Sequence, residues 1–189
     1  MSILPIHKLF LSPEQGWDGI AQSQPSPLKL FLLLVLPFSL IPPLMLEYAG
    51  HHLGAILFPD AAGQAWSMAA LVFLVAELAT VPLMAWAIQS VANSKGIESR
   101  YREAFTLAAI APVPLWLSSL VLFSGQIVLI AAMLLLGVAG SVVLIFRGVE
   151  SILKVDEGLV AFDIAFTVTA LCLIAWVVLV MLGLIPALA

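Results

Sequence analysis

The sequence predicts an all-α, polytopic membrane protein, with five transmembrane helices preceded by a short interfacial amphipathic helix. Hydrophobic residues make up 63% of the chain and charged residues only 10%, whereas soluble domains are about half apolar and about a quarter charged. A soluble fold of 189 residues has too little interior to bury this much apolar surface, so the excess must face lipid. The composition therefore excludes a soluble enzyme, a nucleic-acid-binding protein and a secreted disulfide-bonded scaffold.

Residues 1–27 precede the first long apolar stretch and form a cytoplasmic N-terminal segment in this interpretation. Ser12 fits an N-cap position and Pro13 the first position of a helix. A helix from Pro13 to about Ala21 places Trp17 on an apolar face, which predicts a helix in the membrane interface with Trp17 as its anchor at headgroup depth. An irregular tail is the alternative. The lack of an early apolar run argues against a cleaved signal peptide.

Residues 28–189 contain the apolar stretches that we predict to span the membrane. A hydrocarbon core of about 30 Å needs roughly 20 mostly apolar residues in a helix. Five stretches satisfy this requirement, over residues 28–48, 66–92, 104–123, 126–146 and 160–185. A β-barrel would show short alternating segments instead, so we predict a five-helix transmembrane domain.

The positive charges predict the orientation of the chain. They lie before or at the start of the first span, between the second and third, and between the fourth and fifth: Lys8, Lys29, Lys95, Arg100, Arg102, Arg147 and Lys154. The connections on the other side contain no Lys or Arg. Because cytoplasmic loops are rich in these residues, we predict a cytoplasmic N-terminus and an external C-terminus.

Small residues and prolines interrupt the predicted spans. Gly137 and Ser141 form a small-xxx-small pattern, which permits close packing of helices inside the bundle or at a dimer face; we expect internal packing. Prolines inside spans kink helices where neighbours satisfy the freed backbone groups. The candidates for such kinks are Pro37, Pro82, Pro112 and Pro114.

Glu77 is the most informative polar residue, because it lies near the middle of the second predicted span. An ionisable group at this depth is costly and is by default a candidate functional group. No Lys or Arg lies at a matching depth, so we expect a neutral, protonated carboxyl group. We expect it level with Pro37, the Pro112–Pro114 pair and Gly137. There it either donates a hydrogen bond to a backbone carbonyl freed by a proline or forms a proton or cation site, and a position nearer the membrane interface is the third alternative.

Glu47, His51 and His52 cluster at the outer end of the first span. Glu47 and His51 are four residues apart and share a face if the helix continues, which would give a partial transition-metal site. We expect Gly50 to end the helix, so histidines in an ordinary loop are the favoured interpretation. The sequence contains no nucleotide-binding or hydrolase motif. We therefore expect no metal, no cofactor and no enzymatic activity.

The segment RGVESILKVDEGLVAFD is amphipathic and mixed in charge. It is either a surface that binds a partner or a solvated connector between two spans, and the sequence alone favours the connector. Its candidate partner-contact residues are Arg147, Glu150, Lys154, Asp156, Glu157 and Asp163.

Three segments resemble the bacterial Yip-domain proteins, which are the prokaryotic relatives of the Ypt/Rab-GTPase-interacting membrane proteins. They are SPEQGWDGI, RYREAFTLAAIAPVPLWLSSLV and FRGVESILKVDEGLVAFDIAF. Five spans with a cytoplasmic N-terminus agree with the resemblance, which covers nearly the whole chain. The positions that match the family's pattern are Pro13, Trp17, Pro112, Pro114, Gly148, Glu157 and Gly158.

The resemblance implies a fold and a topology rather than an activity, and it implies a place in a bacterial inner membrane. The eukaryotic members bind Rab GTPases, but this sequence lacks their long N-terminal region and their DLYGP-like motif, so we do not infer Rab binding. The leading prediction is a non-enzymatic scaffold or subunit of a membrane assembly, in contact with lipids and with another membrane protein or a second copy. The alternatives are a small transporter or channel that uses Glu77, and a membrane-shaping protein. No nucleic-acid partner is expected.

Overall fold

The computed structural model describes residues 13–23, 25–54, 56, 63–155 and 158–188. It contains five helical segments that are long and apolar enough to cross a membrane: Pro27–Gly54, Ala65–Ser94, Tyr101–Ser124, Ile127–Ile152 and Gly158–Leu184. These segments confirm the five predicted spans, and the fourth extends beyond its predicted end. The described residues contain no β-strand.

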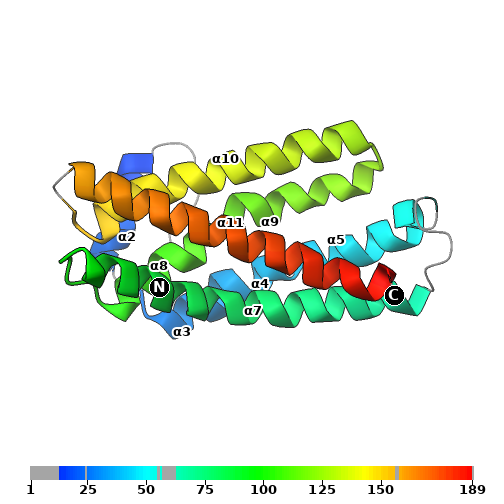
Figure 1. Cartoon of the computed structure of the whole chain (residues 1–189), viewed down its shortest axis with the longest axis horizontal. Coiled ribbons are helices and arrows are strands. Elements are labelled where there is room, and N and C mark those ends of the chain that lie inside the picture. The colour runs from blue at the N-terminus through cyan, green and yellow to red at the C-terminus, as the bar shows by residue number, and fades with distance from the viewer. Residues whose placement is uncertain (1–12, 24, 55, 57–62, 156–157, 189) are drawn as a thin grey trace.

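The five spans run side by side as an elongated bundle (Figure 1). The long helix α7 (Gly63–Ser94) packs most extensively against α11 (Gly158–Leu188) and against α8 (Tyr101–Ile110). The helix α10 (Ile127–Ile152) packs against α9 (Val113–Ser118) and also against α11.

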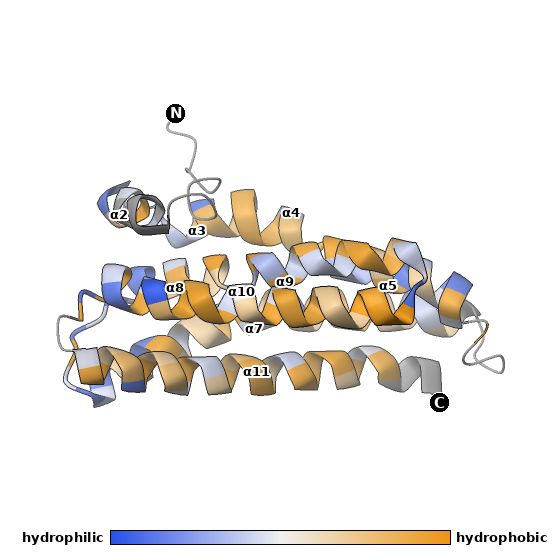
Figure 2. Ribbon diagram, turned by 90° about the horizontal axis from the view of Figure 1, so that it is seen from above, coloured by the Kyte–Doolittle hydropathy of each residue, from blue (hydrophilic) through white to orange (hydrophobic). Residues whose placement is uncertain are grey.

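The third span is the centre of the bundle. In it, 61% of the most apolar stretch is buried, compared with 11–33% for the other four spans. The remaining helices therefore turn large apolar side chains outward, as the hydropathy colours of Figure 2 show along α7 and α11. A protein with this surface requires lipid around it.

The polar residues gather at the ends of the bundle (Figure 2). Every Lys and Arg that the structure describes lies at or near one end, where α7 and α10 finish and α3 (Pro27–Leu30), α8 and α11 begin. We call this the basic end. The helix α2 (Pro13–Ser23) lies across it and packs on α10. A helix thus begins at Pro13 as expected, whereas its place in the membrane interface stays a prediction. Ser12, its expected N-cap, lies outside the described residues.

The first span is interrupted by π-helical turns rather than by one simple kink. A π-helical turn at Phe31–Val35 ends two residues before Pro37, where the lack of a backbone N–H removes a hydrogen bond from the helix. The span consists of α3, η1 (Phe31–Val35), α4 (Leu36–Ser39), α5 (Ile41–Ala49) and η2 (Gly50–Gly54). The structure therefore places an irregularity at Pro37, as predicted.

The third span is broken in two. α8 ends at Ile110, and Pro112 is the residue that precedes α9, so the break coincides with the predicted proline position. The span finishes as a 3₁₀-helix, η3 (Ser119–Ser124), and Gly125 adopts φ +64° in the tight turn to α10. By contrast, α7 continues through Pro82 without a break.

Gly137 and Gly50 are among the glycines that lie where helices approach each other too closely to admit a larger residue. A Cβ atom at Gly137 would lie 2.5 Å from Ser118 Oγ, so this glycine packs α10 against α9, and internal packing is confirmed. A Cβ atom at Gly50 would lie 2.4 Å from the ring of Trp66. The expectation that Gly50 ends the helix is wrong, because the backbone continues as η2 and its two glycines leave room for that ring.

Replacing Gly50 with Ala should destabilise the contact between the first and second spans. The added methyl group overlaps the Trp66 ring, and overpacking of this kind costs about 1–3 kcal/mol. The midpoint of SDS-induced unfolding in mixed micelles measures the effect. Gly158→Ala is the matched control, because nothing lies within 4 Å of a Cβ atom there; equal midpoints for the two variants would contradict the close packing.

Candidate functional site

Glu77 is buried inside the membrane-spanning part of the bundle, with 5% of its surface exposed. Its side chain meets Trp116, which comes from α9 and is also buried. The indole Nε1–H of Trp116 donates a hydrogen bond to Glu77 Oε1. Glu77 therefore lies at the depth of the third-span prolines, as predicted. The expected partner was wrong, because the carboxyl group accepts a hydrogen bond from an indole instead of donating one to a freed backbone carbonyl.

The broken third span positions Trp116 for this bond. Pro112 precedes α9, and its carbonyl oxygen accepts the first hydrogen bond of the new helix from Trp116 N, at 2.9 Å. Trp116 is thus set by the first turn of α9 rather than by a continuation of α8. Pro112, a predicted kink, therefore positions the side chain that donates to Glu77 in the second span.

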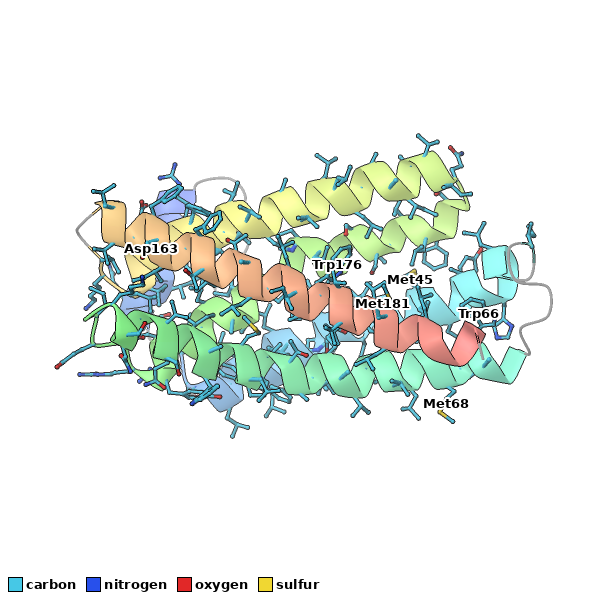
Figure 3. The ribbon with its side chains drawn as sticks, viewed as in Figure 1. Met45, Trp66, Met68, Asp163, Trp176 and Met181 are labelled. Carbon is cyan, nitrogen blue, oxygen red and sulfur yellow. The ribbon has the colours of Figure 1, made fainter. Side chains whose placement is uncertain are left out.

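A cavity of about 100 Å³ lies beside this hydrogen bond. Residues of α7, α10, α11 and both parts of the third span line it, and most of the lining is apolar. The indoles of Trp116 and Trp176 contribute to the wall, and Figure 3 shows Trp176 midway along α11. The polar lining residues are Glu77, Thr80, Ser141, Thr169 and Cys172.

Three of these polar residues have a buried side-chain oxygen without a hydrogen-bond partner among the described residues: Glu77 Oε2, Ser141 Oγ and Thr169 Oγ1. Thr80 differs, because its hydroxyl donates to the backbone oxygen of Ala76 at 2.7 Å. An unpaired buried polar group typically costs about 1–3 kcal/mol. The gathering of three such groups around one cavity identifies it as the candidate functional site.

The sequence provided only part of this site. Glu77 was predicted from its depth, and Ser141 was noted as a small packing residue. Trp116, Thr169 and Trp176 were missed, because an isolated tryptophan or threonine in an apolar span carries no signal of its own. Only the position of Trp116, four residues after Pro112, hints that a helix start orients it.

The cluster of Glu47, His51 and His52 at the end of the first span does not bring three metal ligands together. Glu47 Oε1 lies 3.1 Å from His51 Nε2, so these two residues are together as predicted, and Ser67 Oγ donates to the same oxygen at 2.8 Å. His52 turns away, with its Nδ1 2.8 Å from the backbone oxygen of Tyr48. Within the described residues, no group of three or more His, Cys, Asp and Glu side chains is placed to hold a metal ion.

The described residues between the fourth and fifth spans pack against the bundle through buried apolar side chains. Ile152, Leu153 and Val155 are buried, while Lys154 between them is exposed and adopts φ +53°. With this left-handed backbone, the side chain of Lys154 points to solvent while its apolar neighbours are buried. Glu150 is exposed on the last turns of α10.

The other predicted contact residues of this segment are distributed differently. Arg147 is exposed on α10. Asp163 lies on α11 at the basic end (Figure 3), and its Oδ2 is 2.5 Å from Lys95 Nζ. That ion pair links α11 to the end of α7, so Asp163 already has a partner within the chain. Asp156 and Glu157 lie outside the described residues.

Trp17 is fully buried, which corrects its predicted role as an anchor among lipid headgroups. Its ring belongs to the main apolar core and lies against α10, where a Cβ atom at Gly148 would be 3.0 Å away. Burying the large indole against a glycine holds α2 on the bundle. Trp17 and Gly148, two of the positions that carried the family resemblance, thus contact each other.

Comparison with known proteins adds one finding. The family model described as the Yip1 domain matches residues 8–179. No curated protein and no solved structure matches the chain.

Replacing Trp116 with Phe should destabilise the bundle, because it leaves Glu77 Oε1 without its donor in a buried site. We expect a loss of about 1–3 kcal/mol in the free energy of unfolding, measured by SDS titration in mixed micelles. Trp86→Phe is the matched control on the exposed face of α7 and should have little effect. If Trp116→Phe were as stable as the control, the hydrogen bond would not contribute to the fold.

Proposed function

The chain belongs to the Yip1 domain family of membrane proteins, and from this starting point we propose that it acts as a non-enzymatic scaffold or subunit of a membrane assembly. We place the N-terminus and the basic end in the cytoplasm, because loops rich in Lys and Arg remain on that side. The membrane is the bacterial inner membrane in this proposal.

One observation carries the proposal: the charged surface formed by Arg147, Glu150 and Lys154 at the basic end. The neighbouring residues Ile152, Leu153 and Val155 are buried, and the backbone of Lys154 adopts φ +53°. A loose solvated connector needs neither feature. Charged groups held in a fixed arrangement favour recognition of a partner with complementary charges.

The environment of Glu77 agrees with a non-enzymatic role. Its hydrogen bond with Trp116 joins the second span to the third, so Glu77 contributes to the packing of the bundle. The cavity beside Glu77 favours a second candidate, a small transporter or channel. We rank it lower because Glu77 is 5% exposed and is held by an internal hydrogen bond.

Photocrosslinking tests the proposed surface directly. A photoreactive amino acid at Glu150 should crosslink one specific protein, or a second copy, in native membranes. The matched control carries the same amino acid at Glu98, which is also exposed at the basic end but lies outside the proposed surface.

The charge reversals Glu150→Lys and Lys154→Glu should each weaken co-purification of that partner, by about tenfold for 1.4 kcal/mol of lost interaction, while membrane insertion is unchanged. Identical crosslinks from Glu150 and Glu98, or unchanged co-purification of the reversed variants, would overturn the scaffold proposal.

A further inference from the structure

We propose that the cavity beside Glu77 binds a small organic ammonium ion, namely a primary amine with a short alkyl body. The inference does not rest on the scaffold role, because it uses only the interior of the bundle. Three properties of the cavity support it: the number and kind of its unpaired oxygens, its charge, and the size and character of its wall.

The unpaired oxygens match the donors of a primary ammonium group. Glu77 Oε2, Ser141 Oγ and Thr169 Oγ1 are buried, line the same cavity and have no partner among the described residues. Each of these oxygens accepts hydrogen bonds, and an ammonium group has three N–H donors and no acceptor. The second oxygen of Glu77 is already bonded to Trp116, which fixes the carboxyl group with its free oxygen available.

The charge of the cavity calls for a cation. Among the described residues that line it, Glu77 is the only Asp, Glu, Lys, Arg or His. No basic side chain among these residues is present to balance a carboxylate, so we expect Glu77 to be neutral in the protein alone and to ionise when a cation binds beside it. A buried charge is tolerated when it is paired and hydrogen-bonded, so a cationic ligand supplies what the protein lacks. An anion would find no positive partner among the lining residues, and a neutral molecule would not stabilise the ionised form of Glu77.

The wall selects a ligand with a short apolar body. Side chains such as Met84, Leu115 and Val138 line the cavity beside the polar groups. Trp116 and Trp176 line it as well, and indole rings attract nearby cations. The volume is about 100 Å³, which is smaller than the roughly 150 Å³ cavity that accepts benzene. It therefore suits an amine with about three or four carbon atoms.

Saturation-transfer NMR on the full chain in lipid nanodiscs tests the proposal, with n-butylammonium chloride as the probe. Its uncharged counterpart, n-butanol, has nearly the same size and shape. We expect saturable binding of the amine with a dissociation constant at least about tenfold lower than that of the alcohol, as the added charged hydrogen bonds imply.

Glu77→Gln removes the charge but keeps an oxygen that accepts from Trp116. It should weaken amine binding by about tenfold or more and leave butanol binding unchanged. Glu47→Gln is the matched control, because this acid lies outside the cavity, and it should have no effect. Thr169→Val preserves side-chain shape and should weaken amine binding about three- to tenfold, which keeps the test decisive if Glu77→Gln does not fold.

Three results would overturn the proposal: no saturable binding of the amine, equal binding of amine and alcohol, or amine binding unaffected by both cavity variants. Equal binding would identify the cavity as a site for neutral amphiphiles. A failed crosslinking test at Glu150 would leave this inference intact, because the two experiments probe different parts of the molecule.

Discussion

The third span has to run through the centre of a bundle whose other helices face lipid, and it does so in two pieces. Because it is the most buried span, both its small side chains and the place where it breaks determine how its neighbours fit. The break at Pro112 starts a new helix that holds Trp116 toward Glu77. The hydrogen bond between these two residues is thus a consequence of where the central helix is interrupted.

This hydrogen bond stabilises Glu77 at a membrane depth where ionisable side chains are unfavourable. Placing an ionisable group at the centre of a membrane helix costs a few kcal/mol on insertion scales, on the order of 2.5–3.5 for Asp. A hydrogen bond between neutral groups returns about 0.5–1.5 kcal/mol, so the bond from Trp116 offsets part of the cost but leaves Oε2 unpaired. A glutamate that served only to join two helices would have no need of the cavity and the two unpaired hydroxyl groups beside it.

The fold was predictable from the sequence because hydropathy and length alone determine where helices cross a membrane. Glu77 was predictable as well, because its depth makes it conspicuous. Trp116 was not, since the partner of an intramembrane residue depends on how each helix is rotated about its axis, and a nearly uniformly apolar span contains little information about rotation. Trp17 was also misjudged from the sequence. Its place before the first span suggested the lipid interface, but Gly148, which is far away in the sequence, leaves room for its ring inside the protein.

A double-mutant cycle between Glu77 and Trp116 tests the central claim most directly. Glu77→Leu and Trp116→Phe would be measured singly and together by SDS unfolding in mixed micelles. We expect a coupling energy of about 1 kcal/mol or more, as found for residues in direct contact. Strictly additive effects would contradict the claim that these two side chains hold the second and third spans together.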